Sequence, residues 1–157
     1  MALEAGNKAP DFSLPPSNDP EERVTLEETK GFKFVLLFFP LAFTEVCTEE
    51  ACTINEDLTE YRRKLKTEIM GVSVDSPFAL EAWKEQEGFD LPMLSDFNRE
   101  MIEDYDVKRD ELLGLKEVAN RAAFVIDGDG IIQYSWETDD PGQIPPFNEI
   151  RNTVESL

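Results

Sequence analysis

The 157-residue sequence contains no histidine, and this absence removes several kinds of active site at once. Hydrolases with a Cys–His pair or a Ser–His–Asp triad need an imidazole as general base, and many metal sites use imidazole as a ligand. Only two cysteines are present, which is too few for a disulfide scaffold and suits a functional thiol in a reducing compartment. We therefore expect a cytoplasmic protein without histidine-based chemistry.

Long apolar runs are also missing. The longest, Phe34–Phe43, covers ten residues and contains Pro40, whereas a helix that crosses a bilayer needs about 20. The first residues, Met1–Asn7, lack a basic region followed by an apolar core, so we expect no secretory signal.

Positive charge is scarce, since 15 Lys and Arg stand against 34 Asp and Glu and give a net charge of −19. Nucleic acids and anionic membranes bind proteins through cations, so the sequence predicts neither as a partner. The simplest explanation of the charge is a highly solvated surface, suited to a high-salt interior. An acidic docking face for a basic partner is the alternative.

The length and the hydrophobic content of 41% are those of one globular domain over residues 1–157. Two runs that are apolar on both faces, Phe34–Phe39 and Ile69–Val74, predict buried central strands. An Asp/Gly turn at 127–130 predicts a hairpin. We expect helices over 47–66, 78–87, 100–105 and 147–157, and further strands or extended pieces near 10–16, 24–26, 91–94, 122–126 and 131–136. This order predicts an α/β fold with a mixed central sheet flanked by helices, a thioredoxin-like fold with extra N-terminal strands.

One cysteine, Cys47, follows an apolar run and a proline at the point where a helix begins. A helix N-terminus carries unsatisfied N–H groups and a partial positive charge, and both favour thiolate over thiol. Because the thiolate is the nucleophilic form, this position predicts cysteine redox chemistry. The plain alternative is a small buried side chain, since cysteine is commonly buried.

The spacing Pro40-x-x-x-Thr44-x-x-Cys47 resembles the active-site signature of the peroxiredoxins, thiol peroxidases built on a thioredoxin-like fold. The signature alone is moderately specific, but further segments agree with the family in order along nearly the whole chain. They are Ala9-Pro10-Asp11-Phe12, Gly71-Val72-Ser73-Val74-Asp75-Ser76, Leu91-Pro92-Met93-Leu94-Ser95-Asp96 and Asn120-Arg121-Ala122-Ala123-Phe124-Val125-Ile126-Asp127.

The resemblance implies roles for individual residues. Cys47 would attack a peroxide oxygen and become a sulfenic acid. Thr44 would direct its hydroxyl toward the thiolate and the peroxide, and Pro40 would shape the loop and shield the thiolate. Arg121 would lie beside Cys47 and stabilise charge on the leaving oxygen, and Glu50 matches a family position that holds this arginine. Each residue also has a plain alternative. Thr44 would cap the helix and Pro40 would end the strand. Arg121 would pair with a surface carboxylate, and Glu50 would lie on a solvated helix face.

The resemblance also implies the reaction partners. The substrates would be hydrogen peroxide and small alkyl hydroperoxides, reduced without a metal, haem or flavin. Electrons would come from thioredoxin or another thiol reductant, and the chain would be a monomer or a homodimer.

A second cysteine, Cys52, leaves two subgroups open. The segment Phe38–Thr44 is similar to the AhpE-type one-cysteine class, whereas a second cysteine five positions after the first is similar to the bacterioferritin-comigratory-protein (peroxiredoxin Q) class. In the latter, Cys52 would resolve the sulfenic acid as a disulfide. Residues five apart in a helix have Cα atoms about 8–9 Å apart, while a disulfide tolerates at most about 7 Å. Either the first helical turns unwind, or an external thiol resolves the sulfenic acid and Cys52 is a packed thiol.

Other classes of protein fit less well. A thioredoxin-type oxidoreductase needs Cys-x-x-Cys, but four residues separate Cys47 from Cys52, and a phosphatase-like Cys-x5-Arg fails because Thr53 occupies the arginine position. A peroxide-sensing switch that uses Cys47, or a thioredoxin-like interaction protein without efficient turnover, remains as an alternative to the enzyme.

Overall fold

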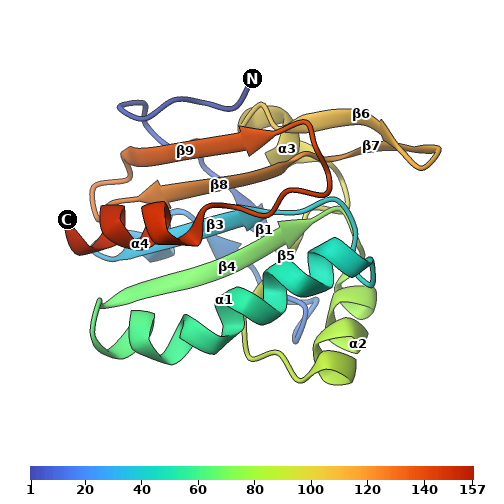
Figure 1. The fold of residues 1–157 in the computed structure, drawn as a ribbon, viewed down its shortest axis with the longest axis horizontal. Coiled ribbons are helices and arrows are strands. Elements are labelled where there is room, and N and C mark those ends of the chain that lie inside the picture. The colour runs from blue at the N-terminus through green and yellow to red at the C-terminus, as the bar shows by residue number, and fades with distance from the viewer.

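The computed structural model describes residues 1–157, and its centre is a five-stranded mixed sheet in the order β5-β4-β3-β8-β9 (Figure 1). The strands β3 (Lys33–Phe38), β4 (Thr67–Ser73) and β5 (Met93–Ser95) run parallel to one another. Beyond β3, β8 (Arg121–Ile126) pairs antiparallel with it, and β9 (Ile132–Thr138) pairs antiparallel with β8. This arrangement confirms the predicted fold class.

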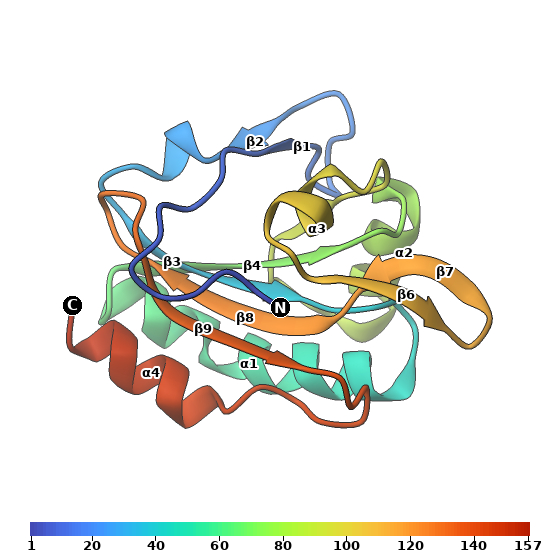
Figure 2. The same ribbon diagram turned by 90° about the horizontal axis from the view of Figure 1, so that it is seen from above.

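Both faces of the sheet are covered (Figure 2). Helices α1 (Glu45–Arg63), α2 (Pro77–Glu87) and α4 (Phe147–Glu155) pack against one face. The other face lies beneath the short helix α3 (Glu100–Asp104) and the N-terminal segment. That segment forms the extra strands β1 (Ser13–Leu14) and β2 (Val24–Thr25) and a 3-10 turn at Glu27–Thr29.

The core explains why the central strands carry no polar alternation. Successive side chains of a strand point to opposite faces, and here both faces are buried. In β3, Phe34, Leu36 and Phe38 enter one hydrophobic cluster. Val35 and Leu37 enter the other, which also contains the buried residues of α1, α2 and α4.

Most of the predicted elements are confirmed, with shifted ends. The helix expected over 47–66 begins at Glu45 and ends at Arg63, so Cys47 lies in its first turn and not at its first residue. Ser76 caps α2 by accepting a hydrogen bond from the Ala79 backbone, and Gly88 ends that helix in a left-handed conformation. The hairpin around residues 127–130 is present as β8 and β9.

One hairpin was missed, namely β6 (Lys108–Leu112) paired with β7 (Leu115–Ala119). It extends from the body of the molecule (Figure 2), and most of its side chains are exposed, so no apolar alternation marks it in the sequence. Its turn places Leu113 and Gly114 at positive φ, the geometry of a type I′ turn. Turns of this type usually carry Asn-Gly or Asp-Gly. Leu113 takes the place of the Asn or Asp, so the sequence pattern did not reveal this turn.

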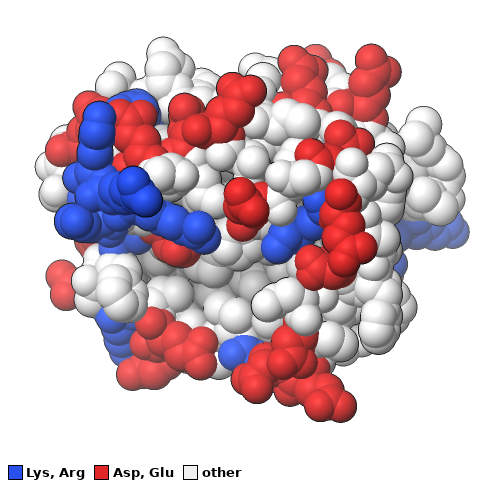
Figure 3. Space-filling view, turned by 90° about the horizontal axis from the view of Figure 1, so that it is seen from below, with Lys and Arg blue, Asp and Glu red and all other residues white.

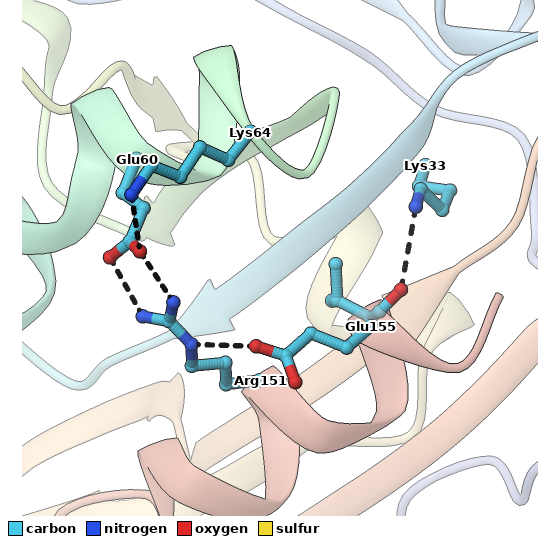
Figure 4. A network of polar contacts seen from close by, with 6 residues as sticks. Lys33, Glu60, Lys64, Arg151 and Glu155 are labelled. Atoms are coloured by element: carbon cyan, nitrogen blue, oxygen red, sulfur yellow. Dashed lines mark hydrogen bonds and ion pairs between the residues drawn. The ribbon is translucent and has the colours of Figure 1, made fainter.

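A polar network ties the last helix to the first (Figure 4). Arg151 of α4 donates to both carboxylate oxygens of Glu60 in α1, at 2.6 and 2.9 Å, and to Glu155 at 2.9 Å. The Lys33 ammonium donates to the Val154 carbonyl at 3.4 Å. The Arg151–Glu60 contacts join α4 to α1, and the Lys33 contact joins α4 to β3. Partly exposed ion pairs of this kind add little stability of their own.

The surface charge is unevenly spread. Figure 3 shows one face on which Asp and Glu are scattered, while Lys and Arg gather toward one end. Four of the 15 cations, Arg62, Arg63, Lys64 and Lys66, lie at or just after the C-terminus of α1, where the helix dipole favours positive charge. No helix in the structure has both the length and the apolar character required to span a membrane.

Candidate functional site

The sheet register brings together residues that are far apart in the sequence. The antiparallel pairing of β3 with β8 places Phe38, the last residue of β3, opposite Ala122. Arg121, the first residue of β8, therefore lies at the edge where β3 ends and the chain turns toward α1. This pairing brings Arg121 beside Cys47, a residue 74 positions earlier.

The Arg121 guanidinium is the centre of the site. Its Nη1 donates to the Cys47 sulfur at 3.4 Å and to Glu50 Oε2 at 3.1 Å, and its Nη2 donates to the Pro141 carbonyl at 2.8 Å. Arg121, Glu50 and Cys47 are each at most 2% exposed. The sequence predicted Arg121, Cys47 and Glu50 as site residues. The Pro141 carbonyl lies in a loop that carries no signal for this role.

Except for the Arg121 guanidinium, the surroundings of Cys47 are apolar. It is the third residue of α1 and belongs to the hydrophobic cluster that includes Ala42 and Ala51. Two cavities of about 600 and 530 Å³ lie elsewhere, and Cys47 lines neither. The sulfur is thus held beside a cation but almost closed off from solvent.

The loop that leads to Cys47 is fixed by hydrogen bonds. Thr44 is the N-cap residue of α1, yet its side chain makes no capping bond. Its hydroxyl donates to the Leu41 carbonyl at 2.8 Å. Asp75, which follows β4, accepts from the Ala42 backbone N–H at 2.8 Å. Pro40 is buried just after β3.

The Thr44 hydroxyl donates to the Leu41 carbonyl, and the expectation that this hydroxyl is directed toward the thiolate and the peroxide stays a prediction. The hydroxyl oxygen keeps its acceptor capacity, because a hydroxyl is one donor and two acceptor sites. Asp75 holds this loop through its bond to the Ala42 backbone, a role that the sequence did not predict.

Glu50 is a buried carboxyl under two opposing influences. Burial raises its pKa to about 7, and the nearby Arg121 guanidinium opposes that rise. Glu50 Oε1 and Arg121 Nε have no hydrogen-bond partner within the protein. Such unsatisfied buried groups are costly, and they often mark a place where a small polar molecule binds.

Cys52 lies apart from this group. It is exposed on α1, whereas Cys47 is buried, and both are free thiols. Partial burial raises the pKa of Cys52, and the negative charges of Glu87 and Glu56 raise it further. The structure brings Cys47 and Glu50 together around the Arg121 guanidinium. Thr44 is the N-cap residue of the same helix and Pro40 lies in the loop before it, whereas Cys52 is exposed further along α1.

The arrangement can hold a sulfur anion and stabilise a second negative charge that forms next to it. No group of three or more Cys, Asp or Glu side chains is placed to bind a metal ion. What the site offers is a nucleophile, a fixed cation and unpaired hydrogen-bonding atoms in an environment of low dielectric, where electrostatic interactions are strong.

Comparisons with known proteins relate the chain to one family. The model of the AhpC/TSA family matches residues 5–135. The alkyl hydroperoxide reductase E of Mycobacterium tuberculosis is 37% identical over 145 residues, which cover 90% of each chain. The chloroplastic 2-Cys peroxiredoxin BAS1 of spinach is 37% identical over 83% of this chain and 51% of its own.

Solved structures are similar over the whole chain. The peroxidoxin BcpB of Mycobacterium tuberculosis superposes with a TM-score of 0.85 at 27% identity, covering 99% of this chain and 98% of that one. The peroxiredoxin Q of Xanthomonas campestris, at 23% identity and a TM-score of 0.83, shares the fold over 98% of each chain.

Replacing Glu50 by Gln should change how stability depends on pH. The native pKa of Glu50 lies above that of the unfolded chain, so its contribution to stability is full at low pH and is lost as the pH rises through about 7. Between about pH 5 and 7 we expect the wild type to lose of the order of 1 kcal/mol per pH unit relative to Glu50→Gln.

Urea denaturation at several pH values measures this difference. Glu49→Gln, an exposed neighbour on α1, is the matched control and should follow the wild type. If the curves of Glu50→Gln and the wild type run parallel, Glu50 does not titrate in this range.

Proposed function

As a member of the AhpC/TSA family, this chain is a peroxiredoxin that reduces peroxides with electrons from thiols, and we propose that Cys47 is its peroxidatic cysteine. The observation that carries this assignment is the 3.4 Å contact between the Cys47 sulfur and the buried Arg121 guanidinium. An arginine is costly to bury without an anion or several acceptors, and a thiolate is such an anion.

The reaction begins with the attack of the Cys47 thiolate on one oxygen of the peroxide. The O–O bond breaks, the sulfur becomes a sulfenic acid, and the other oxygen takes up a proton and leaves as water or an alcohol. Negative charge builds on this leaving oxygen in the transition state. The fixed guanidinium of Arg121 is placed to stabilise that charge, and its unpaired Nε–H is a free donor for a peroxide oxygen.

The surrounding residues prepare this step. Glu50 holds the guanidinium by a buried ion pair of 3.1 Å. Thr44 offers its hydroxyl oxygen at the start of α1, and Pro40 shields the sulfur from water. Hydrogen peroxide and small alkyl hydroperoxides are the substrates we assign to the site.

The sulfenic acid is then resolved by Cys52 or by an external thiol. Condensation with the Cys52 thiol releases water and forms a disulfide, which thioredoxin or another dithiol reduces. The exposed position of Cys52 makes it accessible to a reductant, but the first turns of α1 must unwind before its sulfur reaches that of Cys47. Two free cysteines in a protein of this kind fit the reducing cytoplasm, which is the compartment we propose.

A homodimer is the assembly we propose, on the basis of three exposed phenylalanines. Phe43, Phe78 and Phe97 follow the ends of β3, β4 and β5 respectively. Because these strands are adjacent and parallel, all three residues lie beyond the same end of the strands, which is the end that carries the site. Exposed apolar patches of this kind are typical of protein interfaces.

Replacing Cys47 by Ser should abolish peroxide consumption, because a serine hydroxyl is not ionised at neutral pH and is a weak nucleophile. The assay follows loss of hydrogen peroxide with a thiol reductant in excess. Cys52→Ser is the matched control and should still be oxidised once. A Cys47→Ser variant that retains more than about 5% of the wild-type rate contradicts the assignment. A wild type that oxidises rapidly but recycles slowly would be a sensor and not an efficient peroxidase.

Replacing Cys52 by Ser should stop recycling by thioredoxin if Cys52 is the resolving residue. Intact mass after one equivalent of peroxide separates the two mechanisms. The wild type should lose two hydrogens as it forms the disulfide, whereas Cys52→Ser should gain one oxygen. Full recycling of Cys52→Ser with thioredoxin would establish resolution by an external thiol.

Replacing Phe78 by Glu should dissociate the dimer, because a carboxylate would be buried in an apolar interface. Sedimentation velocity measures the assembly at several protein concentrations. Phe32→Glu is the matched control, since Phe32 is also exposed but precedes β3 and lies at the opposite end of the strands. A wild type that sediments as a monomer rules out the dimer.

A further inference from the structure

The residue before Arg121 is a buried amide whose hydrogen-bonding groups are all engaged. Asn120 is 7% exposed. Its side-chain nitrogen donates to Glu137 Oε2 at 3.1 Å and to Asp139 Oδ1 at 3.2 Å. Its side-chain oxygen accepts from Arg109 Nη1 at 3.3 Å. Neither a carboxylate nor an apolar side chain could make the same set of bonds, because only an amide combines two donors with an acceptor.

Arg109 extends this set of contacts from the β6–β7 hairpin to the loop after β9. Its Nη1 also donates to the Asp139 carbonyl at 2.9 Å, and its Nε donates to the Glu111 carbonyl at 2.9 Å. Asp139 is therefore held both by its side chain and by its backbone. Two residues further on, the Pro141 carbonyl accepts from Arg121 Nη2 at 2.8 Å.

We propose that Asn120 is a positioning residue for Arg121, because it fixes the loop at residues 139–142 whose Pro141 carbonyl orients the guanidinium toward Cys47. This inference rests on the proposed function. Asn120 touches neither the sulfur nor the peroxide, so it acts on the reaction only through Arg121.

The need for such a device follows from how Arg121 is held. Its Nη1 donates to Glu50 and Cys47, and its Nε has no hydrogen-bond partner within the protein. Its Nη2 donates to the Pro141 carbonyl. The loop that supplies this carbonyl lies outside any helix or strand, so no ladder of backbone hydrogen bonds holds it. Its position depends on its own turn contacts and on Asn120 and Arg109.

The decisive variant is Asn120→Asp, which keeps the shape of the side chain but places a carboxylate against those of Glu137 and Asp139. Repulsion should move the loop and release Arg121 from its orientation. We expect the second-order rate of Cys47 oxidation by hydrogen peroxide to fall by about tenfold or more, since small displacements of a catalytic group have effects of this size. The rate of Cys47 alkylation by iodoacetamide, which needs no charge stabilisation on a leaving oxygen, should fall less.

Two further variants keep the test decisive. Asn152→Asp introduces the same charge at an exposed site on α4 and should leave both rates unchanged. Arg109→Met removes the second anchor of the loop without adding a buried negative charge, and it should slow oxidation even if Asn120→Asp does not fold. Circular dichroism and thermal unfolding establish which variants are native.

The outcomes separate this inference from the proposed function. A wild type that oxidises slowly would defeat the proposed function itself. If the wild type is oxidised rapidly, a natively folded Asn120→Asp or Arg109→Met variant that is oxidised within about twofold of its rate would overturn the positioning role of Asn120. The proposed function would then stand. Equal losses in oxidation and alkylation would also overturn it, because they would indicate general disruption around Cys47.

Discussion

The buried guanidinium of Arg121 is the constraint around which the candidate site is organised. A charge removed from water is unfavourable unless other groups replace the lost hydration. Here Glu50, the Pro141 carbonyl and the Cys47 sulfur supply that replacement. In the proposed reaction, the same fixed guanidinium would also stabilise the negative charge that builds on the leaving oxygen of the peroxide.

Much of this could be predicted from the sequence, because the strongest signals are local. The apolar run of β3, the proline and the cysteine at the start of α1 are contiguous, and the Asp/Gly turn fixes β8 and β9 as neighbours. Arg121 could be associated with Cys47 only through resemblance to a family. Their proximity depends on the pairing of Phe38 with Ala122, which no short segment encodes.

The features that were missed carry no periodic pattern or motif in the sequence. The β6–β7 hairpin has no buried face of its own along most of its length, so its strands lack the periodic pattern that marks the others. The Pro141 carbonyl is a backbone group in a loop, and any residue could supply it. The Thr44 proton is donated to Leu41 because the tight turn after Pro40 brings that carbonyl within reach, a local geometry that spacing alone does not reveal.

The placement of Trp83 has a practical consequence. Its indole is fully buried among Phe39, Phe43 and Phe89, and its ring N–H donates to the Thr48 hydroxyl at 3.2 Å. Thr48 is the residue next to Cys47, in the turn of α1 that must unwind before a disulfide forms. Any such unwinding would break this bond and admit water to the indole, so the intrinsic fluorescence of the protein would follow the opening of α1 during the redox cycle without an added label.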